Sequence, residues 1–309
     1  GIKKIESINN ISKEVLEKVN AKYYIPELKI KKYFESTDGT KKWLFEMEDK
    51  KEIETVYIPD NNRGTICISS QVGCTLACSF CHTGTMKFLR NLRMAEILGQ
   101  VIQVKNELND WNKNKERKVT NIVFMGMGEP LYNYENVIKT LNILTDEKGL
   151  AISKRKITLS TSGVVPKIKV FKNDSDVNLA VSLHAAFDEI RNELVPINKK
   201  WPISVLLEAL KEYSNTRKNK RITFEYIMLK DINDSMDDAK ELIKLIRPFK
   251  AKVNLIPFNP WPGSKYQVSS REKIENFKNY ILDKGKLVAT IRTPRGEDVL
   301  AACGQLKSL

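Results

Sequence analysis

From about residue 64 onward, short apolar runs alternate with longer amphipathic segments. In the segment Ile203–Ser214, for example, apolar residues recur at helical spacing, whereas the short runs between such segments are typical of buried strands. Strands that alternate with helices indicate βαβ units, a parallel sheet and right-handed crossovers. Six units favour a partial (β/α)6 barrel, related to the TIM barrel but open, over a complete eight-fold one. The predicted strands are Thr65–Ser69, Asn121–Met125, Lys156–Ser160, Asn178–Leu183, Thr223–Met228 and Lys252–Pro257, and the predicted helices are Ala95–Asn109, Tyr134–Asp146, Ile203–Ser214 and Asp237–Ile246.

The two ends of the chain add further elements. Near the start, Ser12 is a suitable capping residue for a short amphipathic helix that runs to about Asn20. Three strand-like runs follow, and the first two are joined by a Thr-Asp-Gly turn, so we expect a small antiparallel layer that leads into the main domain. The chain therefore divides into an amino-terminal extension, 1–60, and a core, 61–309. The runs in the extension are Leu28–Phe34, Trp43–Glu48 and Ile53–Ile58, and a helix at Ser270–Asp283 and a strand at Leu287–Ile291 follow the sixth barrel strand.

Three of the five cysteines, Cys74, Cys78 and Cys81, form a CxxxCxxC array directly after the first barrel strand. Loops that follow the carboxyl ends of barrel strands are where the chemistry of such folds collects. Thiolates suit iron–sulfur clusters or zinc. A structural zinc site normally has four protein ligands, and His82 is available as a fourth, although ligation by two adjacent residues is sterically awkward. Three cysteines alone would leave one iron of a cubane cluster open to a small molecule.

Polar residues and glycines also stand at the ends of other predicted strands. Gly128 and Glu129 follow the second strand, where a glycine permits close approach to a ligand and a carboxylate can accept hydrogen bonds from an ammonium group. Because the carboxyl ends of parallel strands meet at one mouth of a barrel, we expect these residues to converge. The others are Ser160 at the end of the third strand, Ser182, Leu183 and His184 at the end of the fourth, and Asn259 after the sixth.

Charge points to a polyanionic partner. Lysine and arginine number 52 against 38 acidic residues, a formal net charge of +14, which favours a nucleic acid partner although lysines used only for solubility would give the same excess. No apolar stretch approaches the roughly 18 residues of a membrane span, and the first residues lack an export signal. We therefore expect a cytoplasmic protein with no membrane partner.

The cysteine array, with the aromatic Phe80 before its last cysteine, resembles the signature of the radical S-adenosylmethionine (SAM) superfamily. Further strings resemble one group within it, the RlmN/Cfr family of RNA adenine methyltransferases, and the likeness runs from about Ile11 to Leu306. The strings are 54–59 (ETVYIP), 69–74 (SSQVGC), 125–130 (MGMGEP), 182–184 (SLH), 253–260 (VNLIPFNP) and 301–305 (AACGQ).

The resemblance implies a role for each candidate residue. Cys74, Cys78 and Cys81 would hold a [4Fe-4S] cluster, and two SAM molecules would be used per turnover. Cys303 would carry the methyl group as S-methylcysteine, Cys67 would resolve the intermediate through a transient disulfide with Cys303, and Glu54 would accept a proton. The residues expected to bind SAM are Gly128, Glu129, Ser160, Ser182, Leu183, His184 and Asn259.

The reaction implied is methylation of carbon 2 of an adenosine, in the peptidyl-transferase centre of 23S rRNA and in the tRNA anticodon loop, through a covalent protein–RNA adduct. A flavodoxin-type reductant would supply electrons to a monomer. Family members begin with a helical accessory domain, so the extension is expected to be its remnant plus a small β layer. Three alternatives remain: a carbon-8 rRNA methyltransferase, which the Glu129-Pro130 pair disfavours, a glycyl-radical activase, and a zinc-bearing RNA-binding module.

Overall fold

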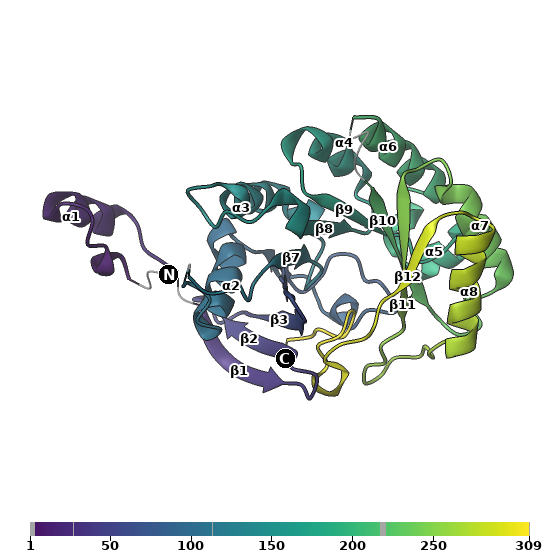
Figure 1. The fold of residues 1–309 in the computed structure, drawn as a ribbon, viewed down its shortest axis with the longest axis horizontal. Coiled ribbons are helices and arrows are strands. Elements are labelled where there is room, and N and C mark those ends of the chain that lie inside the picture. Colours follow the sequence, from purple (N-terminus) through teal and green to yellow (C-terminus); the bar gives the residue numbers. More distant parts are fainter. Residues whose placement is uncertain (1–3, 27, 113, 217–220, 309) are drawn as a thin grey trace.

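One continuous ten-stranded sheet, curved into a partial barrel, organises the molecule (Figure 1). The computed structural model describes residues 4–26, 28–112, 114–216 and 221–308. All six predicted barrel strands are present and parallel, which confirms the fold class, and the predicted strand near the chain end adds a seventh parallel strand. These strands are β4 (Arg63–Cys67), β7 (Asn121–Phe124), β8 (Ile157–Thr161), β9 (Asn178–Ser182), β10 (Ile222–Met228), β11 (Ala251–Pro257) and β12 (Val288–Ile291).

Helices cover the outside of the barrel strands (Figure 1). Five of them were predicted: α2 (Met94–Glu107), α3 (Tyr134–Thr145), α6 (Ile203–Thr216), α7 (Met236–Ile246) and α8 (Arg271–Asp283). Two more, α4 (Val165–Asp174) and α5 (Asp188–Leu194), did not stand out in the sequence. In α4 a proline occupies the first turn, where its missing N–H costs no hydrogen bond, and α5 is only seven residues long.

The barrel strands bury their apolar side chains outward, against the helices, and turn polar side chains inward. In β10, Phe224 and Tyr226 are fully buried, whereas Thr223 and Glu225, which alternate with them along the strand, line the inside of the barrel. Pairing of β10 with β11 and of β11 with β12 sets Glu225 beside Asn254 and Asn254 beside Thr290. The hydrophobic core therefore lies between sheet and helices, and the inside of the barrel is left for a site, unlike the packed interior of a complete TIM barrel.

The amino-terminal strands are antiparallel, as predicted, and belong to the same sheet. They are β1 (Lys29–Glu35), β2 (Lys41–Glu46) and β3 (Glu52–Asp60), and β3 pairs antiparallel with β4. The expected boundary between residues 60 and 61 thus falls in the turn of the β3–β4 hairpin. Helix α1 (Lys13–Lys22) begins at Ser12, whose hydroxyl accepts a hydrogen bond from the Val15 amide, and it buries none of its residues. It projects away from the barrel at one end of the molecule (Figure 1).

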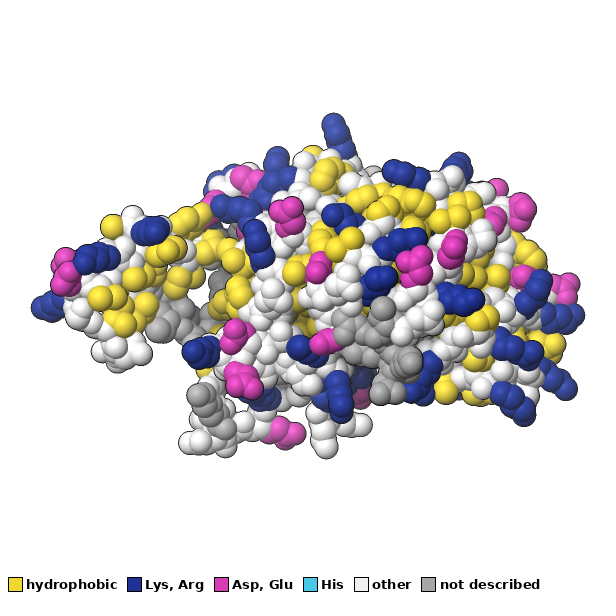
Figure 2. Space-filling view, turned by 90° about the horizontal axis from the view of Figure 1, so that it is seen from above, with side chains coloured by type: hydrophobic (Ala, Val, Ile, Leu, Met, Phe, Trp, Pro, Cys, Tyr) yellow, Lys and Arg dark blue, Asp and Glu magenta, His cyan; other side chains and the backbone are white. Residues whose placement is uncertain are grey.

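Basic side chains are spread over the surface with acidic ones among them, as Figure 2 shows for one face. The same view shows the projecting amino-terminal segment with apolar side chains on its outside. Tyr23, Tyr24 and Ile25 at its end are among the exposed apolar residues. In the part of the chain that the structure describes, every helix is too short or too polar to cross a bilayer.

Candidate active site

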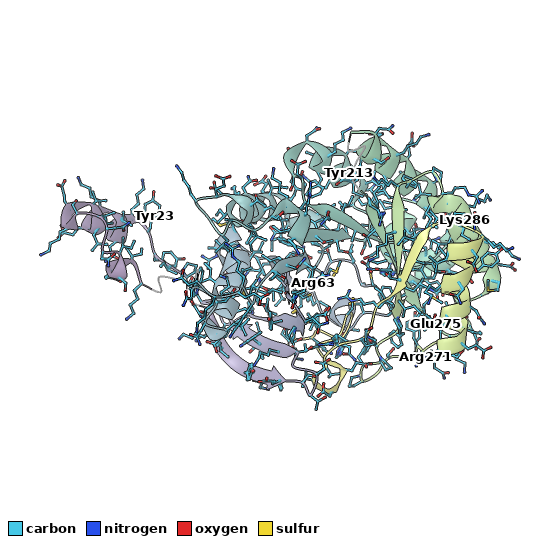
Figure 3. All side chains as sticks on the ribbon, in the orientation of Figure 1. Tyr23, Arg63, Tyr213, Arg271, Glu275 and Lys286 are labelled. Atoms are coloured by element: carbon cyan, nitrogen blue, oxygen red, sulfur yellow. The ribbon has the colours of Figure 1, made fainter. Side chains whose placement is uncertain are left out.

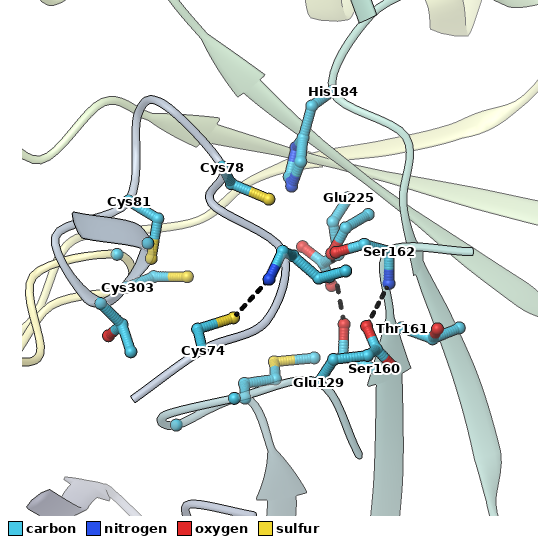
Figure 4. A pocket seen from close by; sticks show the side chains of 18 of the residues that line it. Cys74, Cys78, Cys81, Glu129, Ser160, Thr161, Ser162, His184, Glu225 and Cys303 are labelled. Atoms are coloured by element: carbon cyan, nitrogen blue, oxygen red, sulfur yellow. Dashed lines mark hydrogen bonds between the residues drawn. The ribbon is translucent and has the colours of Figure 1, made fainter. Parts of the chain in front are cut away.

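The three cysteines of the array line one cavity at the carboxyl ends of the parallel strands, here called the carboxy-terminal cavity (Figure 4). The loop after β4 turns tightly around Cys78: the Cys81 amide donates to the Cys78 carbonyl at 3.1 Å, and the Gly84 amide to the Cys81 carbonyl at 2.9 Å. A side chain at Gly84 would lie 2.4 Å from the Cys78 carbonyl oxygen, so glycine is required there. Burial raises the pKa of the Cys74 thiol to about 12, and those of Cys78 and Cys81 are raised as well. Three buried thiols directed at one space fit a cationic group that would stabilise them as thiolates.

The structure gives His82 a different environment from the one a zinc ligand requires. Its ring stacks on Trp261 with centroids 4.6 Å apart, and its Nδ1 lies 3.2 Å from the Gln305 carbonyl oxygen. Among the described residues, no group of three His, Cys, Asp or Glu side chains, the cysteine array included, is arranged to hold a single metal ion. The contacts of His82 tie it to Trp261 and to the carboxy-terminal segment that contains Gln305.

Glu129 reaches the same cavity from the loop after β7. Its two carboxylate oxygens accept hydrogen bonds from the Leu131 amide at 3.0 Å and the Ser162 amide at 2.8 Å. Burial raises the pKa of this carboxyl to about 7. The preceding Gly128 has a φ of +92°, and a side chain on it would lie 2.4 Å from Cβ of Gln71. Glu129 is thus a fixed, buried acceptor that a ligand ammonium group would keep ionised.

Three of the other candidates line this cavity too. The hydroxyls of Ser160 and Ser182 lie 3.5 Å apart at the ends of β8 and β9. His184 has a φ of +62°, its Nδ1 accepts a hydrogen bond from the Ile227 amide, and its ring meets Phe80 edge to face. Burial, aided by the charge of Arg191, lowers the His184 pKa to about 3, so the ring is neutral with its proton on Nε2. The Leu183 side chain is fully buried, and its backbone carbonyl accepts a hydrogen bond from Arg191.

Arg191, which the sequence did not single out, fixes these loops. Its guanidinium is fully buried and donates to the carbonyls of Leu183 (2.9 Å), Ser162 (2.8 Å) and Ser182 (3.2 Å), and to Oδ1 of Asn198 (2.6 Å). Desolvation lowers its pKa to about 10, with no carboxylate in contact among the described residues. The arginine lies in the short α5, where the sequence predicted no helix, so nothing marked it as buried.

A second cavity, of about 560 Å³, occupies the barrel on the other side and is here called the amino-terminal cavity. The first halves of the strands line it, through residues such as Arg63 and Thr65 of β4, Thr223 of β10 and Lys252 of β11. Figure 3 shows Arg63 over the inside of the ring of strands. Period-2 polar residues in otherwise apolar strands, such as Thr223 and Glu225, are the signal in the sequence that could have identified this inner face.

Cys303 lies where the two cavities meet and lines both of them. Cys67 lines the amino-terminal cavity, and both cysteines are free thiols in this structure. The two thiols are close enough to interact electrostatically, since the charge of Cys303 helps burial to raise the pKa of Cys67 to about 12. The other residues shared by both cavities include Met125, Glu225 and Arg292.

The loop that carries Cys303 is held on several sides. The His82 amide donates to the Gly304 carbonyl (2.7 Å), and the Thr83 hydroxyl donates to the Leu306 carbonyl (2.5 Å). Asn259 donates to the carbonyl of Cys303 at 2.9 Å, while its own Oδ1 is buried and has no hydrogen-bond partner in the part of the chain that the structure describes. Asn259 lines the amino-terminal cavity rather than the carboxy-terminal one.

Glu54 lines neither cavity. Its carboxylate pairs with the Lys42 ammonium at 2.9 Å and accepts a hydrogen bond from the Lys307 amide at 2.9 Å. Burial raises the pKa of Glu54, opposed by Lys42. In this structure Glu54 therefore braces the Cys303 loop from outside.

Comparison with known proteins agrees with this site. Residues 68–246 match the model of the radical SAM superfamily. The chain is 53% identical over 323 residues to the dual-specificity RNA methyltransferase RlmN of Brucella melitensis, and 51% identical over 318 residues to that of Rhodopseudomonas palustris. Both alignments cover the whole chain, and 78% and 79% of those relatives. The crystal structure of a radical SAM methyltransferase from Sphaerobacter thermophilus superposes with a TM-score of 0.92 at 39% identity, over 99% of this chain and 89% of that one.

Proposed function

The chain belongs to the radical SAM superfamily and, within it, to the RlmN RNA methyltransferases, and on this premise we propose that it methylates carbon 2 of an adenosine in 23S rRNA and in tRNA. The rRNA target would be in the peptidyl-transferase centre and the tRNA target in the anticodon loop. The position of Cys303 at the junction of two cavities is the observation that carries the proposal. A residue that takes a methyl group on one side and delivers it on the other must face both.

The carboxy-terminal cavity has the donors that the family's cofactors need. Cys74, Cys78 and Cys81 would ligate a [4Fe-4S] cluster and leave one iron open, which the lining of one cavity by all three cysteines supports. When bound, the cluster and SAM supply a carbon-centred radical able to remove a hydrogen atom from a methyl group, and SAM also supplies the methyl group itself.

Glu129 would hold the ammonium group of SAM, because its carboxylate is fixed by two backbone amides and lacks a cation of its own. Ser160, Ser182 and neutral His184 surround the same space and would hydrogen-bond the rest of the molecule. Gly128 and the Leu183 backbone shape that space. Asn259 lines the amino-terminal cavity, and its buried Oδ1, which has no partner among the described residues, would reach the SAM site only from that side.

Cys303 would accept the first methyl group as its thiolate and become S-methylcysteine. Arg292 favours this thiolate, since its charge opposes the rise in Cys303 pKa that burial causes. The methyl group on Cys303 would lose a hydrogen atom to the radical that a second bound SAM supplies, so that two SAM molecules are used per turnover, and its carbon would bond to carbon 2 of the base. The adduct would then give up one electron to the cluster and the carbon-2 proton to a base. The Cys67 thiolate would attack the sulfur of Cys303, the electron pair of the broken carbon–sulfur bond would stay on the carbon and take up a proton to complete the methyl group, and a Cys67–Cys303 disulfide would remain.

The base would enter through the amino-terminal cavity, because the cluster and SAM would fill the other one. Reaching carbon 2 requires an unstacked adenine, which suits a loop of RNA. Arg63, Lys252 and Arg295 line this cavity and would attract the flanking phosphates. The extension would add to the RNA contact, since α1 buries no residue and all of β1 is exposed.

Glu54 is the family's proposed proton acceptor, but its carboxylate here is occupied by Lys42 and Lys307. For Glu54 to accept a proton, the Cys303 loop would move during the reaction and free the carboxylate from Lys42 and the Lys307 amide. The remaining parts of the proposal are a flavodoxin-type electron donor, a monomeric enzyme and a place of action in the cytoplasm, where both RNA substrates are found.

The test is to incubate anaerobically reconstituted protein with SAM, a reductant and unmodified 23S rRNA fragment or tRNA, and to analyse the digested nucleosides by mass spectrometry. The expected product is 2-methyladenosine with wild type and none with Cys303→Ala. A product with the retention time of 8-methyladenosine would assign the chain to the carbon-8 methyltransferases instead. Continued SAM cleavage without any methylated adenosine would contradict the proposed substrates.

A further inference from the structure

We propose that the amino-terminal cavity is also the binding site of a small anionic thiol, of the glutathione class, which reduces the Cys67–Cys303 disulfide from this side of the barrel. The inference rests on the proposed function, because that function produces the disulfide once in each turnover. A reduced thiol pair must be restored before Cys303 can accept another methyl group.

Access to the sulfur favours a small molecule over a protein. Cys67 is only 8% exposed, and what is exposed faces the amino-terminal cavity. A protein reductant would have to bring its own sulfur into bonding distance inside the barrel. The cavity volume of about 560 Å³ lies within the range of roughly 300–1,000 Å³ that small-molecule sites occupy.

The charges of the lining select an anion. Arg63, Lys252, Arg292 and Arg295 line the cavity, against the two carboxylates Asp60 and Glu225. Arg295 is paired with Asp38 at 3.2 Å, but in the described part of the chain Arg63 and Lys252 form no ion pair. Burial lowers the pKa of Lys252; the carboxylate of Glu225 opposes this, and the positive charges of Arg63 and Arg221 add to it. An anion near Arg63 and Lys252 would reduce the repulsion between these cations.

The buried end of the cavity suits the exchange reaction. The thiolate of the reductant attacks Sγ of Cys67, the bond between Cys67 and Cys303 breaks, and Cys303 leaves as a thiolate that then takes up a proton. Burial raises the pKa of Cys303, and the charge of Arg292 opposes this rise and so favours the thiolate that leaves. A second reductant molecule attacks the mixed disulfide on Cys67 and frees its thiol. Two small thiols are thereby oxidised to one disulfide, and the two protein sulfurs are reduced.

The test uses cluster-loaded protein in which the Cys67–Cys303 bond has been formed anaerobically with one equivalent of a thiol oxidant and verified by peptide mapping. Its reduction is timed with glutathione (anionic), 2-mercaptoethanol (neutral) and cysteamine (cationic) at equal thiolate concentrations. We expect glutathione to be about tenfold faster than cysteamine at low salt, and the difference to shrink as ionic strength rises.

Substitutions then locate the effect. Arg63→Gln and Lys252→Gln should slow disulfide reduction by glutathione toward the rate seen with 2-mercaptoethanol. The rate of reduction by 2-mercaptoethanol itself should not change. Lys244→Gln, at a lysine of α7 whose side chain is 77% exposed, is the matched control and should change nothing. Circular dichroism checks that each variant is folded, and the thiol series on wild type decides the question even if one is not.

Three outcomes would overturn the inference: equal rates for the three thiols, equal slowing of all three in the variants, or faster reduction by a protein of the thioredoxin class than by glutathione. Because the disulfide is formed chemically, the result does not depend on methylation. If the reduction rate depends on the charge of the thiol but no 2-methyladenosine is formed, only the proposed function is contradicted. If 2-methyladenosine is formed but the reduction rate does not depend on charge, only this inference is contradicted.

Discussion

The ammonium of Lys42 lies 2.9 Å from the carboxylate of Glu54, and the two side chains are only 7% and 5% exposed. Lys42 also donates to the Leu300 carbonyl at 3.2 Å, and Glu54 accepts from the Lys307 amide. These backbone groups lie on either side of Cys303. One buried ion pair therefore holds both ends of the loop that carries Cys303, the proposed methyl acceptor.

Lys42→Met should destabilise the protein, because it leaves the Glu54 carboxylate buried without a counter-charge. Loss of one partner of a buried pair costs about 3–5 kcal/mol. Urea unfolding measures this change, and hydrogen exchange at 301–306 should speed up at the same time. Lys42→Met combined with Glu54→Gln should recover part of the loss, since no charge is then left unpaired. An unchanged unfolding free energy in the single variant would show that the pair is not buried in solution.

The stability of the protein without its cofactors should fall as the pH rises from about 4.5 to about 7, because of Glu129. Its pKa is about 7 in the folded protein and 4.5 ordinarily, so within this window the unfolded chain gives up the proton first. The contribution is fully present below pH 4.5 and amounts to about 3 kcal/mol. Unfolding at several pH values, compared between wild type and Glu129→Gln, isolates it. Identical pH dependence in the two proteins would rule out the raised pKa.

Arg191→Met should lower both stability and SAM affinity. The substitution removes the donor from four acceptors, two of them buried, at about 1–3 kcal/mol for each buried one, and it releases the loops after β8 and β9. Arg191→Lys, which keeps the charge but not the fork of donors, should have an intermediate effect. Thermal unfolding and equilibrium SAM binding give the two readouts, with Arg271→Met on exposed α8 as the control. A stable variant that binds SAM normally would remove Arg191 from the framework of the site.

Cys67→Ala should trap the enzyme on its substrate, because nothing then attacks the sulfur of Cys303 to release the product. We expect a covalent protein–RNA species on a denaturing gel and little 2-methyladenosine. Cys303→Ala should give neither the adduct nor the product. Free turnover by Cys67→Ala would mean that another group resolves the intermediate.

The sequence predicted the barrel well because the apolar pattern of each strand and of most helices is clear. These apolar side chains form the core between the sheet and the outer helices. It missed α5 and with it Arg191, since seven residues are too few for a periodic signal. Convergence of Glu129, Ser160, Ser182 and His184 followed from their places at strand ends, and the structure brings all four to one cavity.

The position of Glu54 could not be read from the sequence. Its surroundings depend on Lys42, which lies across the β2–β3 pairing, and on Lys307 at the far end of the chain. The amino-terminal cavity was also unforeseen, since an inward polar residue such as Asn254 or Lys252 looks like a solvent-facing one until the sheet is known to close around it.

The loop that carries Cys303 lies between the two cavities of the barrel. On one side of it stand the buried thiols and Glu129, and on the other the arginines and Lys252. Because the sulfur of Cys303 belongs to this loop and faces both cavities, a methyl group that it carried, as proposed above, would pass from one cavity to the other without release into water.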